Sequence, residues 1–141
     1  MARRTELVNH LGNVGLFSGL SKSDLGRIAQ AGEQAEYPEG ATIVEQGDMG
    51  RSAFVILEGT AIVRRGSRKV AELEPGAPFG EMSLLDKGPR TAYVVAGTDL
   101  TVLEIPAKEF MRVLDEVPKL AVKLLATLAG RVRDLDRKAY G

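Results

Sequence analysis

The feature that most constrains this chain is a central stretch of short β-rich runs separated by glycine or proline. Between residues 35 and 105, runs rich in Val, Ile, Thr and Leu alternate with turn residues. Many short strands with regular turn signals favour an antiparallel sandwich or barrel. The runs expected to form strands are 42–45, 53–57, 60–64, 68–73, 91–96 and 100–105. The breaks between them contain Gly40, Gly47, Gly50, Gly59, Gly66, Gly76, Gly80, Gly88 and Gly97.

Two of these turns are short enough for β-hairpins. Glu58-Gly59 and Gly66-Ser67 each lie between two predicted strands. A glycine in such a turn supplies the positive φ angle that a two-residue hairpin needs. Hairpins between successive strands predict a meandering antiparallel barrel.

Helical signals flank the β region on both sides. Ser21 can cap a helix N-terminus, because Asp24 follows three residues later, and Gly32 is a natural stop. Pro106 opens a helical stretch after the last predicted strand. Pro118 fits the first turn of a further helix, where its missing N–H would be unpaired in any case. Apolar residues follow on that helix at Ala121, Leu125, Leu128, Val132 and Leu135.

Length and composition limit the classes of protein to consider. The 141 residues allow one domain with its own core, so residues 1–141 are expected to form a single domain. Lys plus Arg and Asp plus Glu number 19 each, and this balance gives no overall attraction to nucleic acid or to an anionic membrane. The absence of cysteine and the single histidine exclude thiol chemistry and leave a poor ligand set for a metal. No apolar run reaches the ~18 residues of a spanning helix, so we expect a cytoplasmic protein. Because the metal-ligand set is poor and no nucleophile with an adjacent base is visible, we also expect a non-enzymatic protein without a metal.

The stretch from Phe79 to Ala92 is too long for a plain hairpin connection, and long structured loops are where sites tend to lie. Gly80 lets the backbone approach a ligand closely, and residues 82–85 can form one helical turn whose free N–H groups favour an anion. Glu81 can accept a hydrogen bond from a sugar hydroxyl, and Arg90 can fork onto two phosphate oxygens. The alternative, which these residues alone leave open, is an ordinary surface ion pair between Glu81 and Arg90.

At this loop the sequence resembles the cyclic nucleotide-binding domain of the catabolite activator proteins and of the cAMP-dependent protein kinase regulatory subunits. Residues 79–85, Phe-Gly-Glu-Met-Ser-Leu-Leu, and 89–92, Pro-Arg-Thr-Ala, are similar to that family's phosphate-binding cassette. Segments 38–40, 45–48 and 54–59 resemble its early strands and turns, so the similarity runs from about Leu16 to Arg137.

The resemblance implies a mainly β fold with flanking helices. The expected architecture is an antiparallel β-roll over about 35–105, a jelly-roll-like double-stranded β-helix, with N-terminal helices and two C-terminal helices. The ligand would lie inside the roll, and the last helix, about 118–138, would move as a lid.

The resemblance also implies roles for individual residues. Glu81 would hold the ribose 2′-hydroxyl, and Arg90 would pair with the cyclic phosphate, assisted by Ser83 and Thr91. Arg131 would approach the ligand from the last helix. The other residues expected at the cyclic nucleotide site are Phe79, Gly80, Met82 and Ala92 in the cassette, and Val63, Val70 and Ala71 along the base.

The sequence constrains the identity of the nucleotide base less strongly. Where activator proteins read the adenine amino group, this chain has Leu135 and Asp136, and only Asp136 can accept a hydrogen bond. Thr91 has a hydroxyl group at a position where, in this family, a hydroxyl is often associated with tolerance of guanine. The favoured ligand is cAMP, and cGMP is the alternative.

Activator proteins continue into a helix-turn-helix, whereas this chain stops at Gly141. We therefore expect a stand-alone sensor that signals through its last helix to a protein effector or to a second copy of itself, with no direct contact to DNA or to a membrane. An interaction module that keeps the fold without the ligand is the second interpretation.

Overall fold

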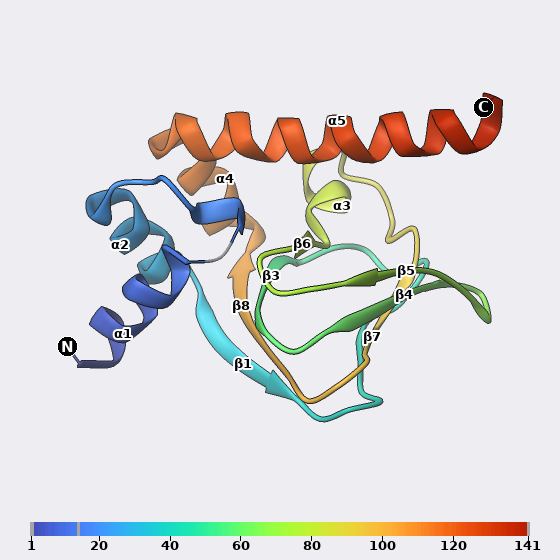
Figure 1. The fold of residues 1–141 in the computed structure, drawn as a ribbon, viewed down its shortest axis with the longest axis horizontal. Coiled ribbons are helices and arrows are strands. Elements are labelled where there is room, and N and C mark those ends of the chain that lie inside the picture. The colour runs from blue at the N-terminus through green and yellow to red at the C-terminus, as the bar shows by residue number, and fades with distance from the viewer. Residues whose placement is uncertain (1, 14, 141) are drawn as a thin grey trace.

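A computed structural model describes residues 2–13 and 15–140, and in this part of the chain two four-stranded antiparallel sheets form a β-roll (Figure 1). The first sheet has the order β1-β8-β3-β6 and the second has the order β2-β7-β4-β5. The strands of the first sheet are β1 (Glu33–Tyr37), β3 (Ser52–Glu58), β6 (Pro78–Phe79) and β8 (Leu100–Pro106). Those of the second sheet are β2 (Thr42–Val44), β4 (Ala61–Arg65), β5 (Arg68–Leu73) and β7 (Tyr93–Ala96). The predicted mainly β class with flanking helices is confirmed.

The turn at Gly59 joins the two sheets and does not form a hairpin. β3 pairs with β6 and β8, whereas β4 pairs with β5 and β7. Gly59 has a φ of +87°, and a β-carbon there would lie 2.2 Å from the carbonyl oxygen of Asp99. The turn thus packs on the β7–β8 turn, where Thr60 N also donates to Thr98 Oγ1 at 3.0 Å. The meandering barrel predicted from Glu58-Gly59 is therefore wrong, while the hairpin at Gly66-Ser67 joins β4 to β5 as predicted.

Two strands carry no clear sequence signal. β1 reads Glu-Gln-Ala-Glu-Tyr, pairs with β8 at an edge of its sheet, and exposes Glu33 and Glu36. Charged side chains are common on an edge because they oppose pairing with another chain. β6 has only two residues, and its pairing with Phe54 and Val55 of β3 defines it.

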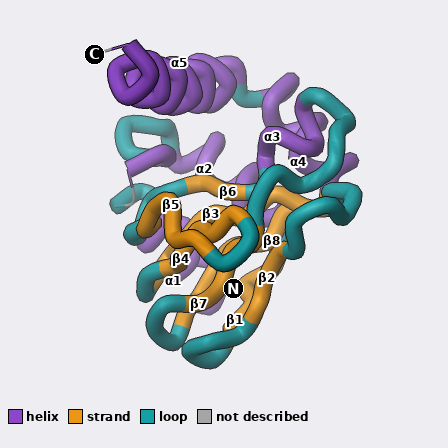
Figure 2. Tube along the Cα trace, turned by 90° about the vertical axis from the view of Figure 1, so that its right-hand side faces the viewer, coloured by secondary structure: helices purple, strands orange, loops and turns teal. Residues whose placement is uncertain are grey.

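Helices cover one end of the roll and one side of it (Figures 1 and 2). They are α1 (Ala2–Leu11), the 3-10 helix η1 (Gly15–Phe17), α2 (Lys22–Ala31), α3 (Glu81–Leu85), α4 (Ala107–Glu116) and α5 (Pro118–Tyr140). The predicted start of α2 is confirmed, because Ser21 Oγ accepts a hydrogen bond from Asp24 N at 3.1 Å. Gly32 ends α2 in extended backbone rather than the left-handed conformation typical of a glycine cap. Packing requires this glycine, since a β-carbon would lie 2.7 Å from the carbonyl oxygen of Glu104 on β8.

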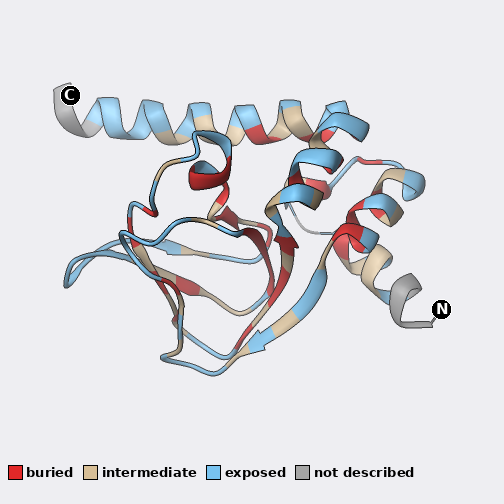
Figure 3. Ribbon diagram, turned by 180° about the vertical axis from the view of Figure 1, so that it is seen from behind, coloured by how far each residue is buried: buried red, intermediate tan, exposed pale blue. Residues whose placement is uncertain are grey.

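Two apolar clusters hold the layers together, and β3 contributes to both. Val55 and Leu57 pack with the helices, whereas Phe54 and Ile56 pack between the sheets. Successive residues of a strand point to opposite faces, so a strand covered on both sides is apolar throughout. Figure 3 shows the buried residues gathered in the roll and on the helix faces turned toward it.

Helix α5 crosses one side of the molecule as a single continuous helix (Figure 1). Among its described side chains only Leu120 and Leu124 are buried, and both lie in its first half. Four apolar residues are 57–65% exposed along the helix, namely Val122, Leu125, Val132 and Leu135. No helix within residues 2–13 and 15–140 has the length and apolar character needed to cross a membrane.

Candidate functional site

The loop between β6 and β7 is built around α3, which begins directly after Gly80. Gly80 adopts a left-handed conformation with a φ of +80°, and a β-carbon there would lie 2.6 Å from Arg90 Nη1. Both the backbone angle and the close approach of the guanidinium therefore require glycine. α3 turns Glu81 and Ser83 inward and leaves Met82 exposed.

Arg90 is buried and bound to main-chain carbonyls. Its side chain donates from Nη1 to Gly80 O at 2.5 Å and from Nη2 to Ser52 O at 2.8 Å, and the residue is 8% exposed. Its backbone is fixed to the β2–β3 loop, since Arg90 N donates to Asp48 O at 2.6 Å and Gly47 N donates to Arg90 O at 2.9 Å. Among the described residues, no carboxylate lies within ion-pair distance of this guanidinium.

The electrostatic setting of Arg90 follows from this burial. Loss of water lowers the pKa of Arg90 from its usual value, while the charges of Glu81 and Asp48 act in the opposite direction. A buried cation without a bound carboxylate is costly for the protein to keep. It is also a strong attractor for an external anion, because the surrounding dielectric constant is low.

Glu81 pairs with Arg131 of α5 and not with Arg90. Arg131 Nη1 donates to Glu81 Oε1 at 2.7 Å, and Arg131 Nη2 donates to Pro78 O at 2.8 Å. Glu81 is 1% exposed, whereas the side chain of Arg131 is 37% exposed. The alternative of a surface ion pair between Glu81 and Arg90 is therefore wrong, because both side chains are buried and each has other partners.

Ser83 lies beside Arg90 against the β2–β3 loop. Its hydroxyl is buried, and a β-carbon on Gly50 would lie 2.0 Å from Ser83 Oγ and 3.2 Å from Arg90 Cζ. Gly50 thus leaves the room that the serine and the guanidinium share. Together the loop and α5 bring one acid, two arginines and one hydroxyl to the same end of the roll.

The remaining predicted residues lie on the elements around this group. Phe79 is buried and stacks on Phe54, with the ring centroids 4.8 Å apart. Ala92 is buried and Thr91 is exposed. The residues expected along the base are on the β4–β5 hairpin, where Val63 and Ala71 are partners in the ladder and Val70 is 37% exposed.

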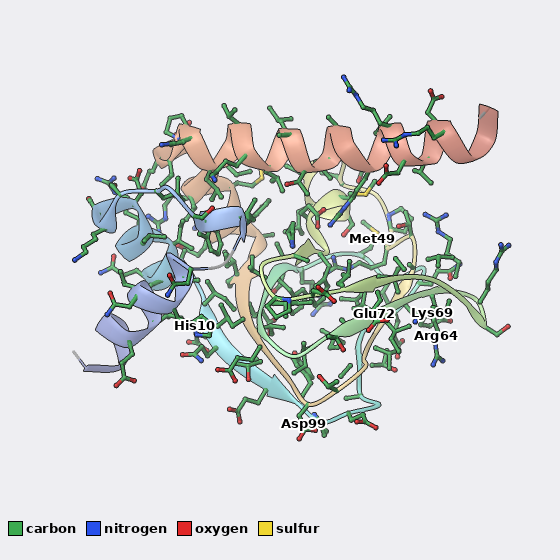
Figure 4. All side chains as sticks on the ribbon, in the orientation of Figure 1. His10, Met49, Arg64, Lys69, Glu72 and Asp99 are labelled. Atoms are coloured by element: carbon green, nitrogen blue, oxygen red, sulfur yellow. The ribbon has the colours of Figure 1, made fainter. Side chains whose placement is uncertain are left out.

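Figure 4 helps to locate these parts. Met49, which forms a β-bridge with Pro89 of the loop, lies on the side of the roll that faces α5. Arg64, Lys69 and Glu72 mark the β4–β5 hairpin, where Lys69 Nζ and Glu72 Oε2 are 3.1 Å apart.

The sequence reasoning missed the groups that hold the two arginines. These are the carbonyls of Ser52, Pro78 and Gly80, which every residue type possesses, so no sequence signal identifies them. Gly50 did carry a signal, since it is one of the glycines that interrupt the β-rich segment, but its contact with Ser83 depends on the packing of two distant segments.

Comparisons with known proteins match this fold and this loop. A family model described as "Cyclic nucleotide-binding domain" matches residues 34–117. The cyclic AMP receptor protein of Thermus thermophilus is 34% identical over 126 residues, which are 86% of this chain and 58% of that protein. A cAMP-dependent protein kinase regulatory subunit of Hypocrea atroviridis is 33% identical over 116 residues, 82% of this chain and 25% of that protein. The chain therefore spans about a quarter to three fifths of the length of these relatives.

Solved structures agree with the sequence comparisons. The crystal structure of Thermus thermophilus catabolite activator protein aligns with a TM-score of 0.80 at 33% identity, covering 88% of this chain and 61% of that one. The regulatory domain of Toxoplasma gondii protein kinase A, determined with cAMP, aligns with a TM-score of 0.80 at 26% identity, covering 92% and 51%. By its sequence, its β-roll and its cassette, this chain belongs to the cyclic nucleotide-binding domain family.

Proposed function

We propose that this domain is a non-enzymatic receptor for a 3′,5′-cyclic nucleotide, with cAMP as the favoured ligand. The observation that carries the proposal is the buried guanidinium of Arg90, which has carbonyl partners but no carboxylate partner among the described residues. The adjacent acid, Glu81, and the adjacent hydroxyl, Ser83, are the groups that a sugar phosphate requires nearby. Membership of the family supports the same ligand class.

The phosphate would bind at Arg90. A cyclic phosphodiester carries a single negative charge, so it supplies the anion that this cation lacks. The planar guanidinium can donate two parallel hydrogen bonds to the exocyclic oxygens once it exchanges carbonyl for phosphate contacts. Each charge-assisted hydrogen bond contributes roughly 1.5–3 kcal/mol net, while micromolar affinity needs about 8 kcal/mol. Together with the ribose contact of Glu81, the loop would thus provide about half of the required affinity, and packing of the base would provide the rest.

The ribose would bind at Glu81. Arg131 donates to Oε1 of this carboxylate, which leaves Oε2 to accept the ribose 2′-hydroxyl. The charge of Glu81 remains balanced by Arg131 in the bound state. The ribose and α5 would therefore contact the same side chain, so that ribose binding affects the contact between Glu81 and α5.

The base would lie along the β4–β5 hairpin. Val63, Val70 and Ala71 offer small apolar surfaces there, and the exposure of Val70 leaves it free to contact a base. Such surfaces accept either purine. cGMP is thus the alternative ligand, with Thr91 as the hydroxyl available to guanine.

Helix α5 would carry the signal. Beyond Leu124, no described side chain of α5 is buried, and an open groove separates this part of the helix from η1 and the β5–β6 turn. The polar contacts of Arg131 are therefore a main attachment of the second half of α5. A helix held this weakly can change its position on ligand binding, and its exposed apolar residues then meet an effector protein or a second copy of the chain.

Calorimetric titration with cAMP and cGMP tests the proposal. We expect binding in the submicromolar to micromolar range and loss of most of that affinity in Arg90→Ala. Arg112→Ala is the matched control, because Arg112 is an exposed arginine that pairs with Glu109 and Glu116 on α4. No heat with either nucleotide at millimolar concentration would contradict the proposal and favour a ligand-free interaction module. Normal binding by Arg90→Ala would contradict the phosphate contact.

A further inference from the structure

The β4–β5 hairpin carries the surfaces proposed for the base, and its outer part has little support from the rest of the roll. β5 is an edge strand, and residues 64–72 are all exposed. The pairing of β4 with β7 ends at Arg64 and Tyr93, so the turn at Gly66-Ser67 projects beyond the sheet (Figure 1). A two-stranded ribbon without further contacts is only marginally stable in water. The position of this hairpin therefore depends on any contact that its turn makes.

The ladder of the hairpin is irregular beside the proposed base surface. Val63 pairs with Ala71, and the next pair is Arg64 with Lys69. Val70 is thus an extra residue in β5 without a partner on β4. A bulge of this kind bends the strand and changes the direction of a side chain. The direction of Val70 therefore depends on how the outer part of the hairpin is held.

The turn of the hairpin is bound to the β2–β3 loop by a side chain. Gly66 N donates to Gln46 Oε1 at 3.0 Å. The next two residues of the same loop hold the backbone of Arg90, since Gly47 N donates to Arg90 O and Arg90 N donates to Asp48 O. Adjacent residues of one loop thus contact the hairpin proposed for the base and the arginine proposed for the phosphate.

We propose that Gln46 is a positioning residue for the nucleotide base, which holds the β4–β5 hairpin at a fixed distance from Arg90 without contacting the nucleotide. The proposal rests on the proposed function and extends it, because it assigns the placement of the base surface to a residue outside that surface. A cyclic nucleotide binds the hairpin and Arg90 at once. A hairpin that is already held at the correct distance loses less conformational freedom on binding, and this raises the affinity.

Three variants separate the hydrogen bond from other effects of substitution. Gln46→Ala removes the acceptor of the Gly66 N–H. Gln46→Glu keeps an acceptor oxygen and adds a carboxylate beside a turn flanked by Arg65 and Arg68, so it should keep the contact. Gln30→Ala, at an exposed position on α2, is the matched control.

Two ligands separate placement of the base from binding of the phosphate. Displacement of radiolabelled cAMP gives the affinity for cAMP and for the methyl riboside 3′,5′-cyclic phosphate, which has no base. In Gln46→Ala, cAMP should bind about threefold to tenfold more weakly, because one hydrogen bond that orders the hairpin is lost. The affinity for the base-free analogue should stay unchanged. Gln46→Glu and Gln30→Ala should bind both ligands as the unsubstituted protein does.

Nitrogen-15 relaxation of the free protein tests the contact without any ligand. The order parameters of the amides of residues 65–68 should fall in Gln46→Ala and be retained in Gln46→Glu. Unchanged order parameters in Gln46→Ala overturn the proposal, because the contact then does not hold the hairpin. An unchanged ratio of the two ligand affinities in that variant also overturns it and leaves the proposed function standing. If the unsubstituted protein binds neither ligand, the proposed function fails and the proposal for Gln46 fails with it.

Discussion

Glu81 Oε1 and Arg131 Nη1 lie 2.7 Å apart and join two parts of the chain that are 50 residues apart. The pair attaches α5 to α3 at the residue proposed to hold the ribose. A ligand that uses the same carboxylate can change the position of α5 only by as much as its affinity differs between the two helix positions. Under the proposed function, the ion pair would thus connect ligand binding to the movement of α5.

Arg131→Gln should loosen the second half of α5. The substitution removes the cation beside a carboxylate that is 1% exposed, and we expect a loss of about 1–3 kcal/mol of stability. Hydrogen exchange measured by mass spectrometry should become faster in residues 125–137 and change little in the roll. Arg133→Gln, at an exposed position two residues further on, is the control. If exchange in α5 is the same in both variants, Arg131 does not attach the helix.

Two glycine substitutions should change stability in opposite directions. A β-carbon on Gly26 in α2 meets no atom within 4 Å, so Gly26→Ala should stabilise the protein by up to about 1 kcal/mol. Gly32→Ala should destabilise it, because the new β-carbon would lie 2.7 Å from Glu104 O. Urea denaturation of both variants measures the difference. Equal midpoints would contradict the close packing of the end of α2 on β8.

The local pattern of the chain predicted the elements whose side chains decide their structure. The apolar runs at 53–57 and 100–105 identified β3 and β8, because both strands are buried on two faces. β1 lacks that pattern, since it lies at a sheet edge. The sheet assignment of β3 and β4 was wrong because the turn at Gly59 packs on a distant turn.

The part of the candidate site that lies in one continuous sequence motif could be predicted from the sequence. Glu81, Ser83 and Arg90 lie in the loop whose residues resemble the family's phosphate-binding cassette, and the structure brings them to one end of the roll with Arg131. The partners of these residues were not predictable. The contact of Arg131 with Glu81 depends on the path of α5, and the unpaired state of Ser83 Oγ depends on how Gly50 packs against it.

Tyr37 should make the protein sensitive to alkali. Burial, followed by the charge of Glu104, raises the pKa of Tyr37 above its ordinary value. In the unfolded chain the phenol ionises near pH 10, whereas the folded protein retains the proton. Its contribution to stability is therefore complete below about pH 10 and is lost as the pH rises further.

Tyr37→Phe removes this group and should reduce the fall in melting temperature above pH 10. Tyr93→Phe on β7 is the matched control. If the melting temperature of Tyr37→Phe falls above pH 10 as steeply as that of the unsubstituted protein, Tyr37 does not cause the sensitivity to alkali.

The position of a bound nucleotide tests the central claim most directly. A crystal structure of the protein grown with cAMP should show the exocyclic phosphate oxygens within hydrogen-bond distance of the Arg90 guanidinium and the ribose 2′-oxygen on the Glu81 carboxylate. Nucleotide bound elsewhere, or a complex in which these two side chains point away from it, would contradict the account.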